Sequence, residues 1–358
     1  MQKFFDTYGI TDEIIAAGVS GGADSLALVL RLHESGRKVI ALTVDHGLRA
    51  ESRSEAEYVG EVMARYGIEH HILTWDGEKP QSGIEEAARQ KRYELLFGWC
   101  RDNHVGVLAV GHHRRDQAET FLLRLQRGSG LDGLCCMQPV IRRGGIMLIR
   151  PQLEDNPEDL KAYLRERGIV WTEDASNLCD DFLRARIRKF LPELERAAGI
   201  SEQRLAETAA VLARTRNYLE EQTVKFIRNH VRCWENAAVS VSLGMLLGQH
   251  QEMAYRILSA LIRETGGRVY APEAEETLRL IEQMREPDFK GCTLGGCEVF
   301  AARKRMWIVP EVKQKQVMSK SEWQKCLQNL PQYAKAELPY KVRRAIYNHL
   351  KKSDNGQK

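Results

Sequence analysis

The first 150 residues alternate short apolar runs with longer stretches of helical spacing, and this alternation limits the possible folds more than any other feature. The apolar runs, which we interpret as strands, are 14–19, 39–44, 70–74 and 105–110. The helical stretches are 25–34, 53–66, 84–102 and 116–127. Parallel strands need crossover connections of this length, and strands without polar alternation are typical of a sheet covered on both faces. The sequence therefore predicts an α/β fold with a doubly wound parallel sheet.

After residue 150 the pattern becomes mainly helical. Helices are predicted for 157–167, for 182–191 with an end at Pro192, for 201–231 and for most of 240–285. A small β element is expected in 286–310, where glycines lie among apolar residues. We place the domain boundary so that residues 1–215 form the α/β domain and 216–358 a mainly helical domain.

The charge distribution separates the two ends of the chain. The sequence has 53 Lys and Arg and 49 Asp and Glu, a net charge of +4. Residues 301–358 contain 14 basic and 4 acidic side chains (+10), so the first 300 residues contain 39 and 45 (−6). A basic terminal segment suits an anionic polymer such as nucleic acid, although a solvated tail would have the same composition.

Cysteine spacing and hydropathy indicate the compartment. The eight Cys form no Cys-x-x-Cys pair, which argues against a disulfide framework or a four-thiolate zinc site and for a reducing cytosol. No run of eighteen apolar residues and no signal peptide is found, so we expect a cytoplasmic protein without a membrane segment.

A glycine-rich turn follows the first predicted strand and opens directly into a helix. Its residues are Ser20, Gly21, Gly22, Ala23, Asp24 and Ser25. Paired glycines let the backbone approach a ligand closely, and the first N–H groups of a helix attract anions, so the turn is a candidate phosphate site. It is neither a Walker A loop nor a dinucleotide fingerprint, and an ordinary strand–helix turn is the alternative. Asp24 would repel phosphates unless Mg²⁺ lay between them; otherwise it is an acid that stabilises the helix N-terminus.

Further candidates follow the later strands. Asp45 and His46 could hold adenine and ribose, or form a plain β-turn. Arg92 shares a helix face with Glu85 and Arg89, which an intrahelical ion pair would also explain.

The fourth strand leads to a second group of candidates. His112 and His113 have no third zinc ligand at suitable spacing. Asp116 and Glu119 could both point into the crevice, although Asp-x-x-Glu is also a capping box. Arg184 and Arg188 share a helical face and suit anionic groups; a solvated face is the alternative.

The Ser-Gly-Gly-x-Asp-Ser turn resembles the PP-loop of the N-type ATP pyrophosphatases, whose fold is adenine nucleotide α-hydrolase-like. Taken in order, the motifs over residues 12–195 resemble those of the tRNA(Ile)-lysidine synthetase family, and residues 293–297 show a weaker similarity to it. The resemblance implies a carbon–nitrogen ligase that uses ATP and Mg²⁺. Members adenylate the C2 carbonyl oxygen of the wobble cytidine in the CAU anticodon of tRNA(Ile). Free L-lysine then displaces AMP and leaves lysidine.

The resemblance also implies roles for the candidate residues. The phosphate turn, Asp45 and His46 would bind ATP, with Mg²⁺ held by Asp24 through the phosphates. Asp116 and Glu119 would bind the lysine ammonium, and Arg92 with Arg184 or Arg188 would contact phosphates or the lysine carboxylate. The candidate catalytic residues are therefore Asp24, Arg92, His112, Asp116 and Glu119. Residues 216–358 would bind tRNA, and a monomer and a homodimer both stay open.

Two departures from the family pattern leave rival interpretations open. Arg115 stands where the family has Asp, and Ala185 where it has Asn, which could alter lysine or metal binding. One rival is another PP-loop activator such as a tRNA thiolase, which the scattered cysteines disfavour. The other is a non-catalytic tRNA-binding paralogue, which only Arg115 suggests.

Overall fold

The computed structural model describes residues 1–48, 52–80, 82–172, 183–268, 270–312, 318–333 and 336–355. Phe182, the first residue of one expected helix, and the side chain of Glu85 lie outside this description. The chain divides into two compact units, Met1–Arg216 and Asn217–Lys358, with the division inside one long helix. None of the described helices is both long and apolar enough to cross a membrane.

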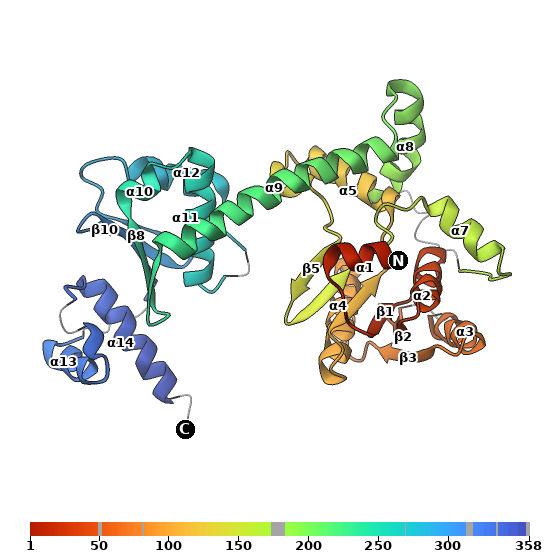
Figure 1. Ribbon diagram of the computed structural model, residues 1–358, viewed down its shortest axis with the longest axis horizontal. Coiled ribbons are helices and arrows are strands. Elements are labelled where there is room, and N and C mark those ends of the chain that lie inside the picture. Colours follow the sequence, from red (N-terminus) through yellow and green to blue (C-terminus); the bar gives the residue numbers. More distant parts are fainter. Residues whose placement is uncertain are drawn as a thin grey trace. The chain divides into compact units, whose positions relative to one another are not determined.

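Unit 1 is built on a six-stranded sheet in the order β3-β2-β1-β4-β6-β5 (Figure 1). The strands are β1 (Ile14–Gly18), β2 (Lys38–Asp45), β3 (Glu69–Thr74), β4 (Val107–Val110), β5 (Val140–Arg143) and β6 (Ile146–Ile149). All neighbouring pairs are parallel except β5–β6. Gly18 pairs with both Leu42 and Val110, so the central strands end at the same edge of the sheet. That edge is where open α/β sheets bind ligands.

Helices cover both faces of this sheet. The helices that begin in this unit are α1 (Gln2–Tyr8), α2 (Ala23–Glu34), α3 (Ser52–Arg65), α4 (Ile84–Asp102), α5 (Arg114–Gln126), α6 (Leu131–Leu134), α7 (Pro157–Arg165), α8 (Leu183–Ala198) and α9 (Glu202–His230). Of these, α8 and α9 pack with α5 in a separate cluster and not on the sheet. Ile15 and Ala17 of β1 pack in one core with α2, α3 and α7, whereas Ala16 packs in another with α4. Successive side chains of a strand therefore pack into cores on opposite faces of the sheet, which confirms the doubly wound architecture.

Two features of unit 1 differ from the sequence prediction. The helix expected to end at Pro192 continues to Ala198. Leu191 and Leu194, on either side of the proline, pack with α5 and α9, and this burial outweighs the hydrogen bond that proline removes. The β5–β6 hairpin was not expected, although its two-residue Gly144-Gly145 turn is a known hairpin signal.

Unit 2 is helical around a five-stranded antiparallel sheet in the order β7-β8-β11-β10-β9. The strands are β7 (Arg232–Trp234), β8 (Ala238–Ser242), β9 (Cys292–Leu294), β10 (Cys297–Ala302) and β11 (Arg305–Pro310). The remaining helices are α10 (Leu243–Leu247), α11 (Gln251–Thr265), α12 (Ala274–Gln283), α13 (Lys320–Asn329), η2 (Pro331–Tyr333) and α14 (Tyr340–Asn355). Trp307, Trp323, Tyr333 and Tyr347 are buried in the core beside α14, so these aromatic rings stabilise the fold and are not available for base stacking.

Candidate active site

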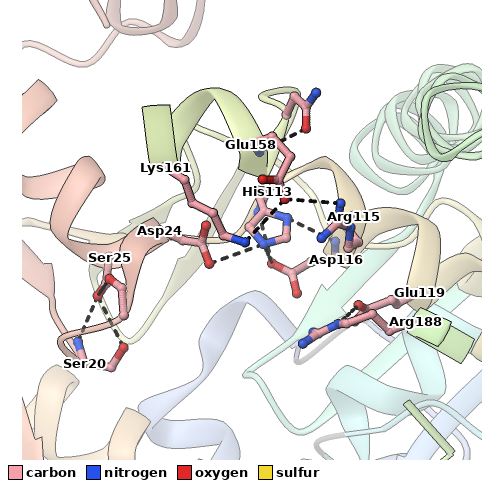
Figure 2. Close-up of polar contacts among 12 residues, drawn as sticks. Ser20, Asp24, Ser25, His113, Arg115, Asp116, Glu119, Glu158, Lys161 and Arg188 are labelled. Atoms are coloured by element: carbon pink, nitrogen blue, oxygen red, sulfur yellow. Dashed lines mark hydrogen bonds and ion pairs between the residues drawn. The ribbon is translucent and has the colours of Figure 1, made fainter. Parts of the chain in front are cut away.

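The phosphate turn lies between β1 and α2 and is held by its own serines. Ser25 Oγ donates to the Gly22 carbonyl oxygen (2.9 Å) and accepts from the Ser20 amide (3.1 Å), as Figure 2 shows in part. Gly21 has φ +85°, a conformation that favours glycine. The helix begins after Gly22, which has no side chain to cap it, so its first N–H groups face the ligand side. The turn therefore fits a phosphate group by both shape and charge.

A cavity of about 270 Å³ opens beside this turn. Among the residues that line it are the candidates Ser20, Gly22, Asp24, Ser25, His46, Arg92 and His112. The structure thus brings together groups from the ends of three strands and from α4, and the site can accommodate a nucleotide.

The lining of this cavity includes groups to which the sequence analysis assigned no role, among them Thr172. The Thr172 amide donates to the Gly21 carbonyl oxygen (3.0 Å) and ties a distant segment to the phosphate turn. Arg89, Arg92 and Tyr93 of α4 also line the cavity, at helical spacings of three and four. The helical spacing of Arg89 and Tyr93 relative to Arg92 could have identified them in the sequence. Nothing in the sequence indicates that Thr172 lies at this site.

Asp45 and His46 take different roles. Asp45 is buried and accepts hydrogen bonds from the Gly47 amide (3.0 Å) and the Ser52 hydroxyl (2.6 Å). The Ser52 hydrogen bond in particular lowers the pKa of Asp45. The structure thus supports the turn interpretation for Asp45 and places only His46 on the cavity wall.

His46 and His112 are both neutral groups in this site. Burial and then the Arg92 guanidinium lower the pKa of His46 to about 4, and Arg92 Nε lies 3.4 Å from His46 Nε2. Burial lowers the pKa of His112 to about 3, and its Nδ1 is buried without a hydrogen-bond partner in the described chain. Among the residues that the structure describes, no three His, Cys, Asp or Glu side chains are placed to hold a metal ion.

The N-terminus of α5 corrects the capping prediction. The N-cap is His113 and not Asp116: His113 Nδ1 accepts from the Asp116 amide (3.4 Å), and Asp116 Oδ2 accepts from the His113 amide (3.1 Å). The expected Asp116–Glu119 box does not form because the helix already begins at Arg114. Glu119 is instead fully buried, one turn further along.

Asp116 and Glu119 are paired with two of the arginines of α8, Arg184 and Arg188. Arg184 Nε lies 2.6 Å from Glu119 Oε2, its Nη2 lies 2.8 Å from Asp116 Oδ1, and Arg188 Nε lies 2.6 Å from Glu119 Oε1. Burial alone would raise the pKa of Asp116, but His113 and the Arg184 guanidinium hold it below its ordinary value. We expected the carboxylates and the arginines to contact separate parts of the substrates, and the structure shows that they also contact each other.

Arg115, the main departure from the family pattern, points away from these carboxylates. Its Nε lies 2.7 Å from Glu202 Oε1 and its Nη2 lies 3.8 Å from Glu158 Oε1 (Figure 2). Its positive charge is therefore offset outside the Asp116–Glu119 cluster. Ala185, the second departure, is buried in α8.

Asp24 connects the phosphate turn to α5. His113 Nε2 lies 3.4 Å from Asp24 Oδ2 and 3.6 Å from Asp116 Oδ2. Asp24 Oδ1 is buried without a hydrogen-bond partner among the described residues, and an acceptor of this kind fits a bound cation. Burial would lower the pKa of His113, but Asp24 and Asp116 raise it above the ordinary value.

A glycine-rich phosphate turn at the carboxyl edge of a parallel sheet defines a PP-loop nucleotide-binding protein. The family model described as "PP-loop domain" matches residues 1–194. The chain is similar to the tRNA(Ile)-lysidine synthase of Hyphomonas neptunium, with 36% identity over 84% of this chain and 83% of that protein. The synthases of Ruegeria pomeroyi (35% identity; 84% and 71%) and Wolbachia pipientis wMel (32%; 87% and 73%) are also similar. The chain belongs to the tRNA(Ile)-lysidine synthase family and is an ATP-dependent ligase.

Proposed function

We propose that the chain adenylates the C2 carbonyl oxygen of the wobble cytidine in the CAU anticodon of tRNA(Ile), with release of pyrophosphate. The ε-amine of free L-lysine then forms a bond to C2, and the oxygen leaves with AMP. The observation that carries this proposal is that Asp24 in the phosphate turn and Asp116 in the carboxylate–arginine cluster both lie within 3.6 Å of the same imidazole nitrogen. A site for ATP thus adjoins a site suited to a cationic amino acid.

In the first half-reaction the turn would hold the leaving pyrophosphate. The N–H groups at the start of α2 and the Ser20 hydroxyl would be the donors, and the Ser25 hydroxyl would hold the turn through Gly22. His46 and Arg92 line the cavity beyond them. Asp24 would hold Mg²⁺ through its unpartnered Oδ1. When bound, that ion would offset the charge that develops on pyrophosphate. Positioning and charge neutralisation therefore account for the chemistry, with no covalent enzyme intermediate.

In the second half-reaction the carboxylates would receive lysine. The net charge of the carboxylate–arginine cluster is zero, because two carboxylates (Asp116, Glu119) pair with two guanidinium groups (Arg184, Arg188). A lysine ammonium can replace a guanidinium at a carboxylate, and the displaced arginine is then available to the lysine carboxylate. The ammonium must lose a proton before it attacks, and because the pKa of His112 is about 3, we expect that proton to pass to water. His112, on the cavity wall, would instead accept a hydrogen bond from a substrate through its buried Nδ1.

The C-terminal unit would bind the tRNA. The positive charge of this unit supports the proposal, because residues 301–358 carry a net charge of +10. We expect electrostatic contacts to phosphates as the main mode of binding, because four of the aromatic side chains near this basic end are buried. We further propose that the protein acts in the cytoplasm.

The thiolation alternative gains no support from the cysteines. Cys135 and Cys136 are buried, and burial raises the pKa of both thiols, to about 11 for Cys136. A sulfur-transferring thiol needs the opposite, an accessible group with a lowered pKa.

The deciding experiment supplies ATP, labelled lysine and a CAU-anticodon tRNA(Ile) transcript. Label in the RNA together with AMP and pyrophosphate supports the ligase. AMP without label in the RNA would indicate a different PP-loop activator, and neither product would indicate a binding protein. A transcript with a CAU anticodon in a methionine tRNA body serves as the specificity control.

A further inference from the structure

Both ring nitrogens of His113 have polar neighbours, and Nε2 lies close to carboxylates from two elements, Asp24 of the phosphate turn (3.4 Å) and Asp116 of α5 (3.6 Å). Nδ1 accepts a hydrogen bond from the Asp116 backbone amide at the start of α5 (3.4 Å). Nε2 faces the phosphate turn and lies 3.4 Å from Asp24 Oδ2 (Figure 2). The side chain is only 8% exposed, so water competes little for either contact.

A helix cap alone does not require this residue. Capping needs a single acceptor, and Asn, Asp and Ser supply it better than His does. The chain contains another histidine cap: His250 Nδ1 accepts from the Glu252 amide (3.3 Å) at the start of α11. His250 is exposed, whereas His113 is buried between two carboxylates. The second nitrogen of His113 is therefore the feature that capping leaves unexplained.

The contact to Asp24 has a geometric consequence. With Oδ2 turned toward the imidazole, the other oxygen of Asp24 is left buried and has no hydrogen-bond partner among the residues that the structure describes. A carboxylate oriented through one oxygen by a neighbouring group presents the other to a cation in a defined direction. The same ring also fixes the first turn of α5, which presents Asp116.

We propose that His113 is a positioning residue that fixes Asp24 relative to Asp116, and so sets the placement of the ATP-bound cation against the lysine site. This inference rests on the proposed function, because it assumes that Asp24 serves the ATP half and Asp116 the lysine half. His113 touches neither substrate in this scheme; it acts through the two carboxylates.

Two substitutions separate the nitrogens. His113→Asn places an amide oxygen near the position of Nδ1, so it keeps the cap and loses the contact to Asp24. His113→Gln extends an amide nitrogen toward the position of Nε2, so it can restore that contact. His250→Asn is the matched control, since it exchanges a histidine cap that forms no ion pair with a carboxylate in the described part of the chain.

The main readout is Mn²⁺ affinity in the presence of a non-hydrolysable ATP analogue, measured by electron paramagnetic resonance on the full chain. For His113→Asn we expect this affinity to fall about tenfold, as for other groups that orient a metal-binding carboxylate. For His113→Gln we expect a smaller loss, and for His250→Asn none. Thermal unfolding of His113→Asn should stay close to that of the wild type, because the cap is retained.

Wild-type Mn²⁺ affinity in His113→Asn would overturn the proposal and leave His113 as a cap alone. Equal losses in His113→Asn and His113→Gln would overturn it as well. Failure of the proposed function can be distinguished from failure of this inference. If the wild-type chain binds Mn²⁺ with nucleotide but attaches no lysine to tRNA, the proposed ligase function is refuted, and the Mn²⁺ affinities of the variants still test the role of His113. A wild-type chain that binds no Mn²⁺ with nucleotide would refute both.

Discussion

Gly111 follows β4 and packs directly on the backbone of the phosphate turn. A Cβ atom at this position would lie 2.9 Å from the Asp24 carbonyl oxygen and 3.1 Å from the Ser25 Cα atom. Ordinary Cβ contacts begin at 3.4 Å, so Gly111→Ala requires a shift of about 0.5 Å (3.4 − 2.9 Å). The atoms met are backbone atoms at the start of α2, which cannot rotate away. The substitution should therefore displace the phosphate turn itself.

The expected cost follows from this displacement. Overpacking a closely packed site typically costs about 1–3 kcal/mol, so we expect the free energy of unfolding to fall by about 2 kcal/mol. The loop donors move with the backbone, and a shift of this size should weaken nucleotide binding by about tenfold. Urea unfolding followed by circular dichroism measures the first effect, and calorimetry with a non-hydrolysable ATP analogue measures the second.

Gly98→Ala is the matched control. Gly98 lies inside α4, and a Cβ there would meet only the end of the Arg101 side chain, at 3.8 Å. Alanine is favoured over glycine in a helix by up to about 1 kcal/mol, so this variant should be at least as stable as the wild type. If Gly111→Ala unfolds and binds nucleotide like the wild type, the argument from backbone contact is wrong.

Three further outcomes are expected. Asp24→Asn should abolish pyrophosphate release in a coupled assay while tRNA binding, measured by filter retention, survives; normal release would contradict the metal assignment. Glu119→Gln should raise the lysine requirement by about tenfold or more, from the loss of charged hydrogen bonds, and the ATP requirement far less, in steady-state kinetics; equal changes would point to a structural role. Burial raises the pKa of Cys100 to about 12, so at pH 8 only about one thiol in 10,000 is ionised, and iodoacetamide should alkylate the exposed Cys233 first in peptide mapping. Rapid labelling of Cys100 in the folded chain would refute its burial.

The architecture of the first unit follows from local patterns. The strands at 14–18, 38–45 and 69–74 and the helices between them lie within a few residues of the sequence prediction. Apolar periodicity reports burial on one or two faces of an element, and glycine reports unusual backbone conformation, so both can be read without knowledge of distant residues. The phosphate turn is of this kind, because its glycines, serines and helix start are contiguous.

The sequence alone thus predicts most elements of the first unit, the PP-loop turn and the resemblance to the lysidine synthetase family, since these depend on neighbours in the chain. Only the tertiary structure decided which charges pair. Arg184 pairs with Asp116, which lies 68 residues away in the sequence, and Arg115 pairs with Glu202, which lies 87 residues away. It also decided that Nε2 of His113 faces Asp24 and that Trp307, Trp323, Tyr333 and Tyr347 near the basic end are buried, whereas Tyr340 is exposed. Such pairings depend on how helices pack across the sheet, and a side chain's charge says nothing about which of many oppositely charged partners the fold will bring within 3 Å.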